Sequence, residues 1–146
     1  MKKAPATVDR GPLLGALLRR AHQEVQAHLD DTFRAMGEAP PQGAVGQPLF
    51  DHPEGLRATH LARLAGITKQ SMAEMIDAMV ESGYVERVPD PSDGRARLVR
   101  LTSHGRKLAV RAREAVREVE ARWAARVGAA RIEALRATLA ALVSAT

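Results

Sequence analysis

Apolar residues recur at helical spacing along most of the chain. Near the amino terminus they share one face at steps of three and four residues: Leu14, Leu17, Leu18, Ala21, Val25, Leu29 and Phe33. Pro12 suits the first position of such a helix, and Gly37 suits its end. The pattern therefore predicts one amphipathic helix over about residues 12–36.

Two short helices joined by a tight turn are predicted next. The first covers residues 58–65 and ends at Gly66, because glycine readily adopts the left-handed conformation that follows a helix. Thr68 then caps the second helix, its hydroxyl accepting from an exposed amide of the first turn. The apolar residues of that second helix are Met72, Met75, Ile76, Met79 and Val80, which we expect in the core. Two such helices make a helix-turn-helix.

A hairpin follows the second of these helices. Residues 84–88 and 96–101 are rich in β-branched and aliphatic side chains, which is typical of strands. Between them lie two prolines and an Asp-Gly pair, which supply turn chemistry and are expected to stop both strands. The turn carries Arg95 and Arg97, so the segment is interpreted as a wing beside the helix-turn-helix.

The carboxyl-terminal part is predicted to be helical again. Thr102 can cap a helix that extends from residue 103 to about 126, and Gly128 separates it from a last helix. That last helix has apolar residues in a 3-4-3 spacing, which is a packing seam: Ile132, Leu135, Leu139 and Leu142. Because this seam and the first helix lack partners within the chain, we predict a homodimer built by the first helix and the last two.

The segment between residues 37 and 55 is rich in proline and glycine. Gly43, Gly46 and Pro48 all disfavour a helix interior. We expect at most a short helix there, over about residues 41–47. Taken together, the predicted elements indicate a fold class that is mainly α with a small β-hairpin wing (α+β). It consists of a winged helix-turn-helix lobe plus amino- and carboxyl-terminal dimerisation helices.

The excess positive charge lies in the wing and the start of the helix that follows it. The net charge is +5, from 22 Lys and Arg against 17 Asp and Glu. Residues 84–113 hold eight basic and three acidic residues, so they account for the whole excess. A solvated charged face is the ordinary explanation of such a run. Its coincidence with a hairpin favours contact with the phosphates of a nucleic acid.

Composition excludes several other classes of function. The absence of cysteine rules out disulfides, thiolate catalysis and Cys-type zinc sites. The five histidines show no metal-ligand spacing, and there is no nucleophile elbow, phosphate-binding glycine loop or convincing carboxylate pair. We therefore expect neither an enzyme nor a cofactor. No apolar run is long enough for a membrane span or a signal peptide, so a cytoplasmic protein is expected.

Several motifs together resemble one family. They are Gly66-Ile67-Thr68-Lys69-Gln70-Ser71, Gly83-Tyr84-Val85-Glu86-Arg87, Asp90-Pro91-Ser92-Asp93-Gly94-Arg95, and Leu101-Thr102 followed by Gly105. At this spacing the chain is similar to the MarR family of winged-helix transcriptional regulators, over about residues 56–108. The resemblance implies a dimeric repressor or activator that binds a pseudo-palindromic operator in double-stranded DNA.

The resemblance also implies which residues meet DNA. Lys69, Gln70 and Ser71 would lie in the major groove and Arg95 in the minor groove, while Asp93 would pair with Arg95 or its neighbours. The full predicted set is Thr68, Lys69, Gln70, Ser71, Ala73, Glu74, Arg87, Asp93, Arg95 and Arg97. Gln70 suits an adenine, Lys69 a guanine or a phosphate, and Glu74 either a cytosine or, more readily, a nearby Lys or Arg. Gly94 stands where the family often has arginine, which puts more weight on Arg95 and Arg97.

A small-molecule effector is a further implication. Many members of the family bind aromatic or phenolic molecules between the dimerisation helices and the DNA-binding lobe. His22, Gln26 and Trp123 are the residues expected to line such a pocket, although an interface histidine and a dimer-core tryptophan are the simpler explanations.

The predicted organisation is a flexible tail over residues 1–10, dimerisation regions over 11–36 and 103–146, and a DNA-binding lobe over 37–102. The leading hypothesis is a sequence-specific dimeric regulator, most naturally a repressor. Two alternatives stay open: a winged helix used as a protein-interaction or dimerisation module, and an architectural DNA binder without an effector.

Overall fold

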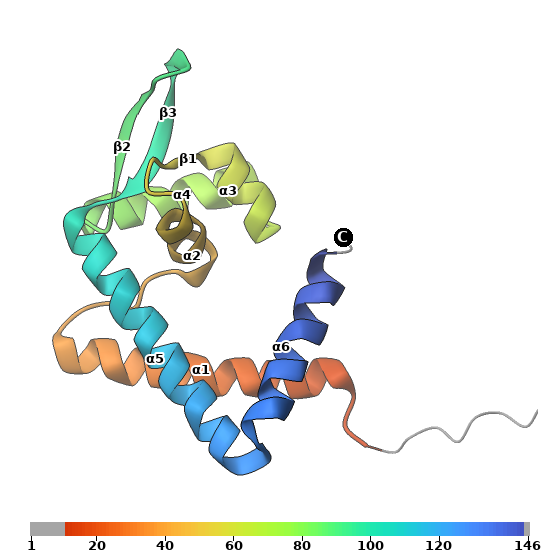
Figure 1. Cartoon of the computed structure of the whole chain (residues 1–146). Coiled ribbons are helices and arrows are strands. Elements are labelled where there is room, and N and C mark those ends of the chain that lie inside the picture. The colour runs from red at the N-terminus through yellow and green to blue at the C-terminus, as the bar shows by residue number, and fades with distance from the viewer. Residues whose placement is uncertain (1–10, 145–146) are drawn as a thin grey trace, which may run out of the picture.

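A computed structural model describes residues 11–144, which form six helices and three strands (Figure 1). The helices are α1 (Leu14–Met36), α2 (Gly43–Asp51), α3 (Ala58–Ala65), α4 (Lys69–Glu81), α5 (Ser103–Val127) and α6 (Ala129–Ser144). The strands are β1 (Leu56–Arg57), β2 (Val85–Asp90) and β3 (Asp93–Leu101). The prediction of a mainly helical chain with a small wing is confirmed. The predicted tail over residues 1–10 lies outside the described residues.

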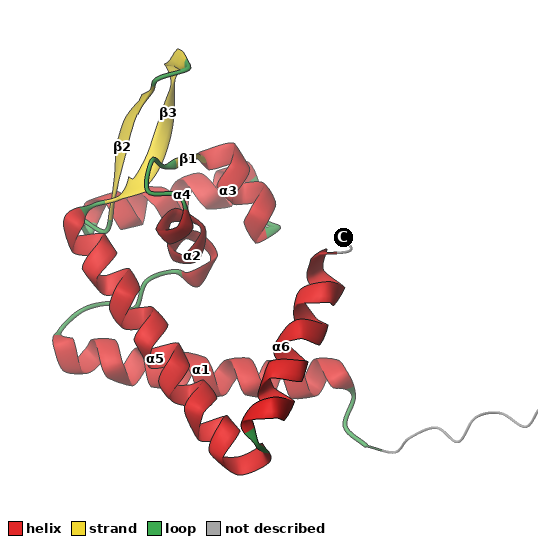
Figure 2. Ribbon diagram, viewed as in Figure 1, coloured by secondary structure: helices red, strands yellow, loops and turns green. Residues whose placement is uncertain are grey.

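The long helix α5 joins two parts of the molecule. At one end α2, α3 and α4 gather beside the sheet, and the hairpin of β2 and β3 projects away from them (Figure 2). At the other end α1 crosses α5, and α6 turns back from the end of α5. None of the side chains of α6 is fully buried within the chain.

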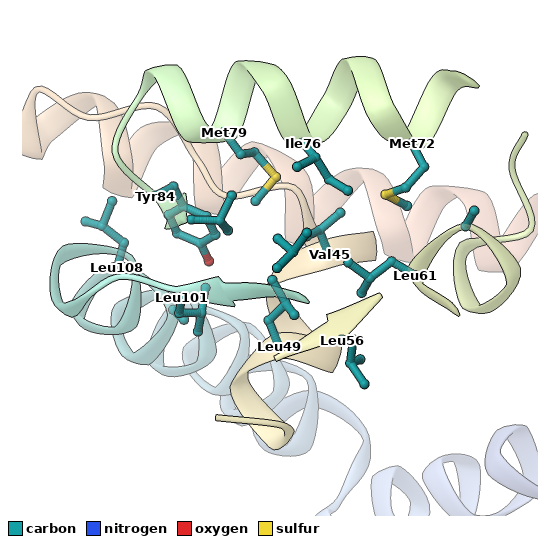
Figure 3. Packing of buried hydrophobic residues seen from close by; sticks show 14 of the residues in the cluster. Val45, Leu49, Leu56, Leu61, Met72, Ile76, Met79, Tyr84, Leu101 and Leu108 are labelled. Carbon is teal, nitrogen blue, oxygen red and sulfur yellow. The ribbon is translucent and has the colours of Figure 1, made fainter. Parts of the chain in front are cut away.

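The core lies beneath the helix-turn-helix (Figure 3). The inner face of α4 supplies Met72, Ile76 and Met79, all buried, whereas Met75 is half-buried against the same cluster. Opposite them lie fully buried side chains from α1, α2, α3 and the sheet: Phe33, Val45, Leu49, Leu61, Val85 and Val99. Burying an aliphatic side chain of this size contributes about 1.5–3 kcal/mol, so this cluster fixes the orientation of α4.

The turn between α3 and α4 has the predicted chemistry. Gly66 adopts the left-handed conformation with φ of 65°. Its amide donates to the carbonyl of Arg63, and the Ile67 amide donates to Ala62 at 3.1 Å, which satisfies the last carbonyls of α3. The Thr68 hydroxyl then accepts from the Ser71 amide at 3.1 Å, so Thr68 is the expected cap.

The prediction for the proline- and glycine-rich segment was wrong. Instead of a short helix over about residues 41–47, α2 begins at Gly43 and continues to Asp51 with Pro48 inside it. Val45 and Leu49 lie four residues apart on its inner face and are fully buried. Their burial outweighs the poor intrinsic propensity of the segment, because packing of an apolar face supplies most of the stability of a helix in a protein.

The wing differs from the prediction in two ways. Its strands are longer than expected, since β2 continues through Pro89 to Asp90 and β3 starts at Asp93. The strand order is β1-β3-β2, so β2 is an edge strand, where the missing N–H of Pro89 costs little. The second difference is β1, a two-residue strand that pairs Leu56 with Val99 and has no signal in the sequence.

Candidate nucleic-acid interface and adjoining cavity

The outer face of α4 is polar and open. Every residue predicted for this face is exposed in the structure: Thr68, Lys69, Gln70, Ser71, Ala73 and Glu74. Met72, Ile76 and Met79 of the same helix point the other way into the core, whereas Val80, also expected there, is exposed. The helix therefore presents its amino-terminal turn, with its polar side chains, to an external partner.

Two of these side chains already contact each other. The Gln70 side-chain amide donates to Glu74 Oε1 at 3.3 Å. Glu74 therefore pairs with Gln70 rather than with the nearby Lys or Arg that the sequence favoured. The contact holds Gln70 along the helix and leaves its side-chain carbonyl oxygen available as an acceptor.

Arg87 connects the wing to α4. Its guanidinium hydrogen-bonds and ion-pairs with Asp77, which lies two turns along the exposed face of α4. Both side chains are exposed, so the pair adds little to stability. The pair matters for the charge of the surface instead, because Arg87 neutralises an acidic side chain on the face that would approach phosphates.

The turn of the wing, between β2 and β3, is held by a carboxylate that is only 7 % exposed. Asp90 accepts from the Ser92 hydroxyl at 2.7 Å and from the Ser92 amide at 2.8 Å. Its second oxygen accepts from Arg57 of β1 at 2.7 Å. These hydrogen bonds, those from Ser92 above all, lower the pKa of Asp90 to about 2.

Asp93 has a different partner from the expected one. Its carboxylate accepts from the backbone amide of Arg95 at 3.1 Å and lies 3.6 Å from the guanidinium of Arg57. It does not pair with the side chain of Arg95. The reason is the register of the sheet, in which Asp90 and Asp93 face each other across the turn and share the cation of β1.

The wing should be sensitive to acid. Because the pKa of Asp90 is lowered from 3.8 to about 2 in the folded state, its contribution to stability is complete above pH 4 and is lost as the pH falls toward 2. We expect Asp90→Asn to weaken the wing at neutral pH and to remove this part of the acid dependence. Amide hydrogen exchange of residues 90–101 at pH 6 and pH 3 measures it. An unchanged acid dependence in the variant would contradict the assignment.

Arg95 and Arg97 follow this anchored turn on β3. Both are exposed, and among residues 11–144 neither makes an ion pair. The other arginine of β3, Arg100, is paired with Glu86 at 2.7 Å. The projecting hairpin (Figure 2) therefore carries two uncompensated positive charges.

A cavity of about 410 Å³ lies behind this surface. It is bounded by α1, α2, α5, the middle of α6 and the residue that precedes β2. Of the three residues expected at an effector pocket, His22 and Gln26 line this cavity, whereas Trp123 is half-buried elsewhere on α5 and is not a lining residue.

Two polar side chains of the cavity, Arg113 and Tyr84, were missed by sequence reasoning. Arg113 stacks over the ring of Phe50 at 4.5 Å and lies 3.6 Å from Asp51, but its buried Nη1 makes no hydrogen bond. The Tyr84 hydroxyl is also buried without a partner, and burial raises the pKa of Tyr84 to about 12. The cavity thus offers two unsatisfied donors.

A metal site and a membrane-spanning helix are two further possibilities for residues 11–144. Within the described residues, no His, Asp and Glu side chains gather in a group of three or more that could hold a metal ion. None of the six described helices combines the length and the apolar character that crossing a membrane requires.

Comparison with known proteins identifies the family. A model of the MarR family matches residues 51–96. The HTH-type transcriptional repressor Rv2887 of Mycobacterium tuberculosis is 34% identical over 121 residues, which cover 83% of this chain and 86% of that protein. The chain belongs to the MarR family.

Solved structures agree with this assignment. The transcriptional repressor CouR, bound to a 23-mer DNA duplex, is 30% identical to this MarR family chain, with a TM-score of 0.73 over 90% of this chain and 92% of that one. Rv2887 in complex with salicylic acid is 32% identical, with a TM-score of 0.65 over 93% and 99%. Membership of this family of transcriptional regulators confirms the predicted class and the prediction that the chain is not an enzyme.

Proposed function

We propose that this MarR family chain is a cytoplasmic, dimeric transcriptional repressor that reads a pseudo-palindromic operator. The observation that carries the proposal is the exposed polar start of α4 together with the unpaired Arg95 and Arg97 of the projecting wing. The first turn of α4 would read base edges in the major groove, and the wing would reach the minor groove, where the negative potential is strongest. The DNA-bound state of the relative CouR supports this arrangement.

Exposed apolar side chains support the dimer. Residues at the start of α1 and along α6 are exposed although they are large and apolar: Leu13, Leu14, Leu17, Leu18, Leu135, Leu142 and Val143. Patches of this kind mark interfaces. We infer that residues 11–36 and 103–146 form the dimer and that residues 37–102 form the DNA-binding lobe.

A mobility-shift titration at physiological salt tests the proposal. The duplex is selected from genomic DNA by binding, and a shuffled duplex of equal length is the control. We expect preference for an inverted repeat with half-sites about 10 bp apart, one helical turn. Equal affinity for both duplexes would leave architectural binding, and no affinity for either would leave a protein-interaction module.

Gln70→Ala should relax the preference at one base position per half-site. A bidentate pair between glutamine and adenine is worth roughly 1–3 kcal/mol of discrimination, so we expect about a tenfold loss at the matched site and little change at a site that already carries the wrong base. Binding to a panel of single-base operator variants measures it. Equal losses at every site would show that Gln70 contacts the backbone instead.

The cavity is the proposed site of an effector. Its apolar wall includes Val25, Leu29 and Phe50, and its two unsatisfied donors lie on Arg113 and Tyr84. Arg117 and Arg136 are also lining residues, and Arg136 is paired with Glu120. We infer a small aromatic ligand with an acidic group, and the relative Rv2887, solved with salicylic acid, supports this class.

Arg113→Met should weaken salicylate binding about tenfold. Methionine keeps the apolar stem against Phe50 and removes the charged donor, and a hydrogen bond to a charged group is worth about 1.5–3 kcal/mol. Calorimetric titration of the free protein measures the affinity, with Arg122→Met on the exposed face of α5 as the matched control. Equal affinity in the Arg113 variant would place the anion elsewhere.

A further inference from the structure

Tyr84 lines the cavity and also lies in the chain between α4 and β2. The residue is 4 % exposed, and its hydroxyl is buried without a hydrogen-bond partner. Figure 3 shows the ring between Met79 of α4 and Leu101 of β3. Tyr84 is also the residue immediately before β2. One side chain therefore links the cavity to the end of the recognition helix and to the wing.

The backbone of Tyr84 is held from two sides. Its amide donates to the carbonyl of Met79 at 2.9 Å, in the last turn of α4. Its carbonyl accepts from the Thr102 amide at 3.2 Å, at the junction of β3 and α5. Gly105 of α5 lies against that carbonyl so closely that a Cβ there would be 1.8 Å from the oxygen. The backbone of Tyr84 therefore ties the end of α4 to the start of α5.

The hydroxyl itself has almost no free space on the side of α2. A Cβ added at Gly46 would lie 2.8 Å from the Tyr84 oxygen, and the next nearest atom of the ring would be 3.8 Å away. The glycine thus leaves room for the oxygen and for nothing larger.

We propose that Tyr84 transmits occupancy of the cavity to the DNA-binding surface. A ligand atom that enters the space before its hydroxyl displaces the ring, and the ring shifts the end of α4 and the first residue of the wing. The inference rests on the proposed effector site and adds the residue through which it acts. Tyr84 is a positioning residue, since it contacts the ligand and not the DNA.

The contact with Gly46 allows a test without any ligand. Gly46→Ala adds one methyl group against the Tyr84 oxygen and so imitates an occupied cavity. We expect its affinity for the selected operator to fall about tenfold. Tyr84→Phe removes the oxygen, so the double variant Gly46→Ala, Tyr84→Phe should return to within about twofold of the natural chain. Gly43→Ala, one turn earlier on α2 with nothing within 4 Å of its Cβ, should bind like the natural chain.

Amide hydrogen exchange in the absence of DNA gives the second readout. The amides of residues 79–85 and 102 should exchange faster in Gly46→Ala than in the double variant, whereas amides of α1 remain alike. The proposal is overturned if Gly46→Ala behaves as the natural chain in both measurements, if it is unfolded, or if Tyr84→Phe fails to reverse its effect. Failure of the natural chain to bind the operator would instead overturn the proposed function, while the exchange comparison still decides the role of Tyr84.

Discussion

Replacing Arg95 and Arg97 together by alanine should lower the affinity for operator DNA on the order of 100-fold at physiological salt. The two arginines are exposed and make no ion pair with the described residues, so their charge is available to DNA. A dimer would lose four charges in all. Because each neutralised phosphate contributes about 0.9 to the slope of log affinity against log salt, that slope should fall by up to about 3 or 4.

The wing itself should stay folded in this variant, since Arg57 and Ser92 hold Asp90 at its turn independently of the two arginines. Arg122→Ala with Arg126→Ala is the matched control, because it removes the same charge from exposed positions near the end of α5. Mobility shifts at several salt concentrations measure both. Equal losses in the two double variants would mean that net charge, and not the wing, governs binding.

Gly105→Ala should be among the most destabilising single changes in the chain. The added Cβ would lie 1.8 Å from the carbonyl oxygen of Tyr84. This oxygen belongs to the backbone, so it cannot rotate away as a side-chain atom would. Overpacking costs typically 1–3 kcal/mol and occasionally more, so we expect a loss of about 3 kcal/mol and a fall in Tm of about 10 °C.

Chemical denaturation followed by circular dichroism measures the effect. Gly43→Ala makes the same chemical change at a helical position with open space around it, and it should alter the free energy of unfolding by less than about 1 kcal/mol. A Gly105 variant as stable as that control would show that α5 can move away from Tyr84 without cost.

Local signals made the helix-turn-helix predictable. Gly66 requires a positive φ and Thr68 a hydroxyl within reach of its own helix, and both requirements are met within a few residues of sequence. The same applies to Thr102, which accepts from the Gly105 amide at 2.9 Å. The family resemblance then predicted that the wing contacts DNA.

Interactions between distant residues were not predictable. Pro48 is tolerated within α2 because Val45 and Leu49 pack into a core to which the other elements contribute. The pairing of Arg57 with Asp90, 33 residues apart, depends on the unforeseen strand β1. Arg113 and Tyr84 of the candidate cavity likewise come from segments whose neighbourhood only the fold determines.

The exposed helix α6 has a thermodynamic consequence. It buries none of its 16 residues within the chain, and an isolated helix of that length is marginal in water. Its order must then depend on association, so mass action enters the folding equilibrium. The midpoint of thermal unfolding should therefore rise with protein concentration. At a low concentration in the cell, the regulator would lose stability as well as occupancy of its DNA sites.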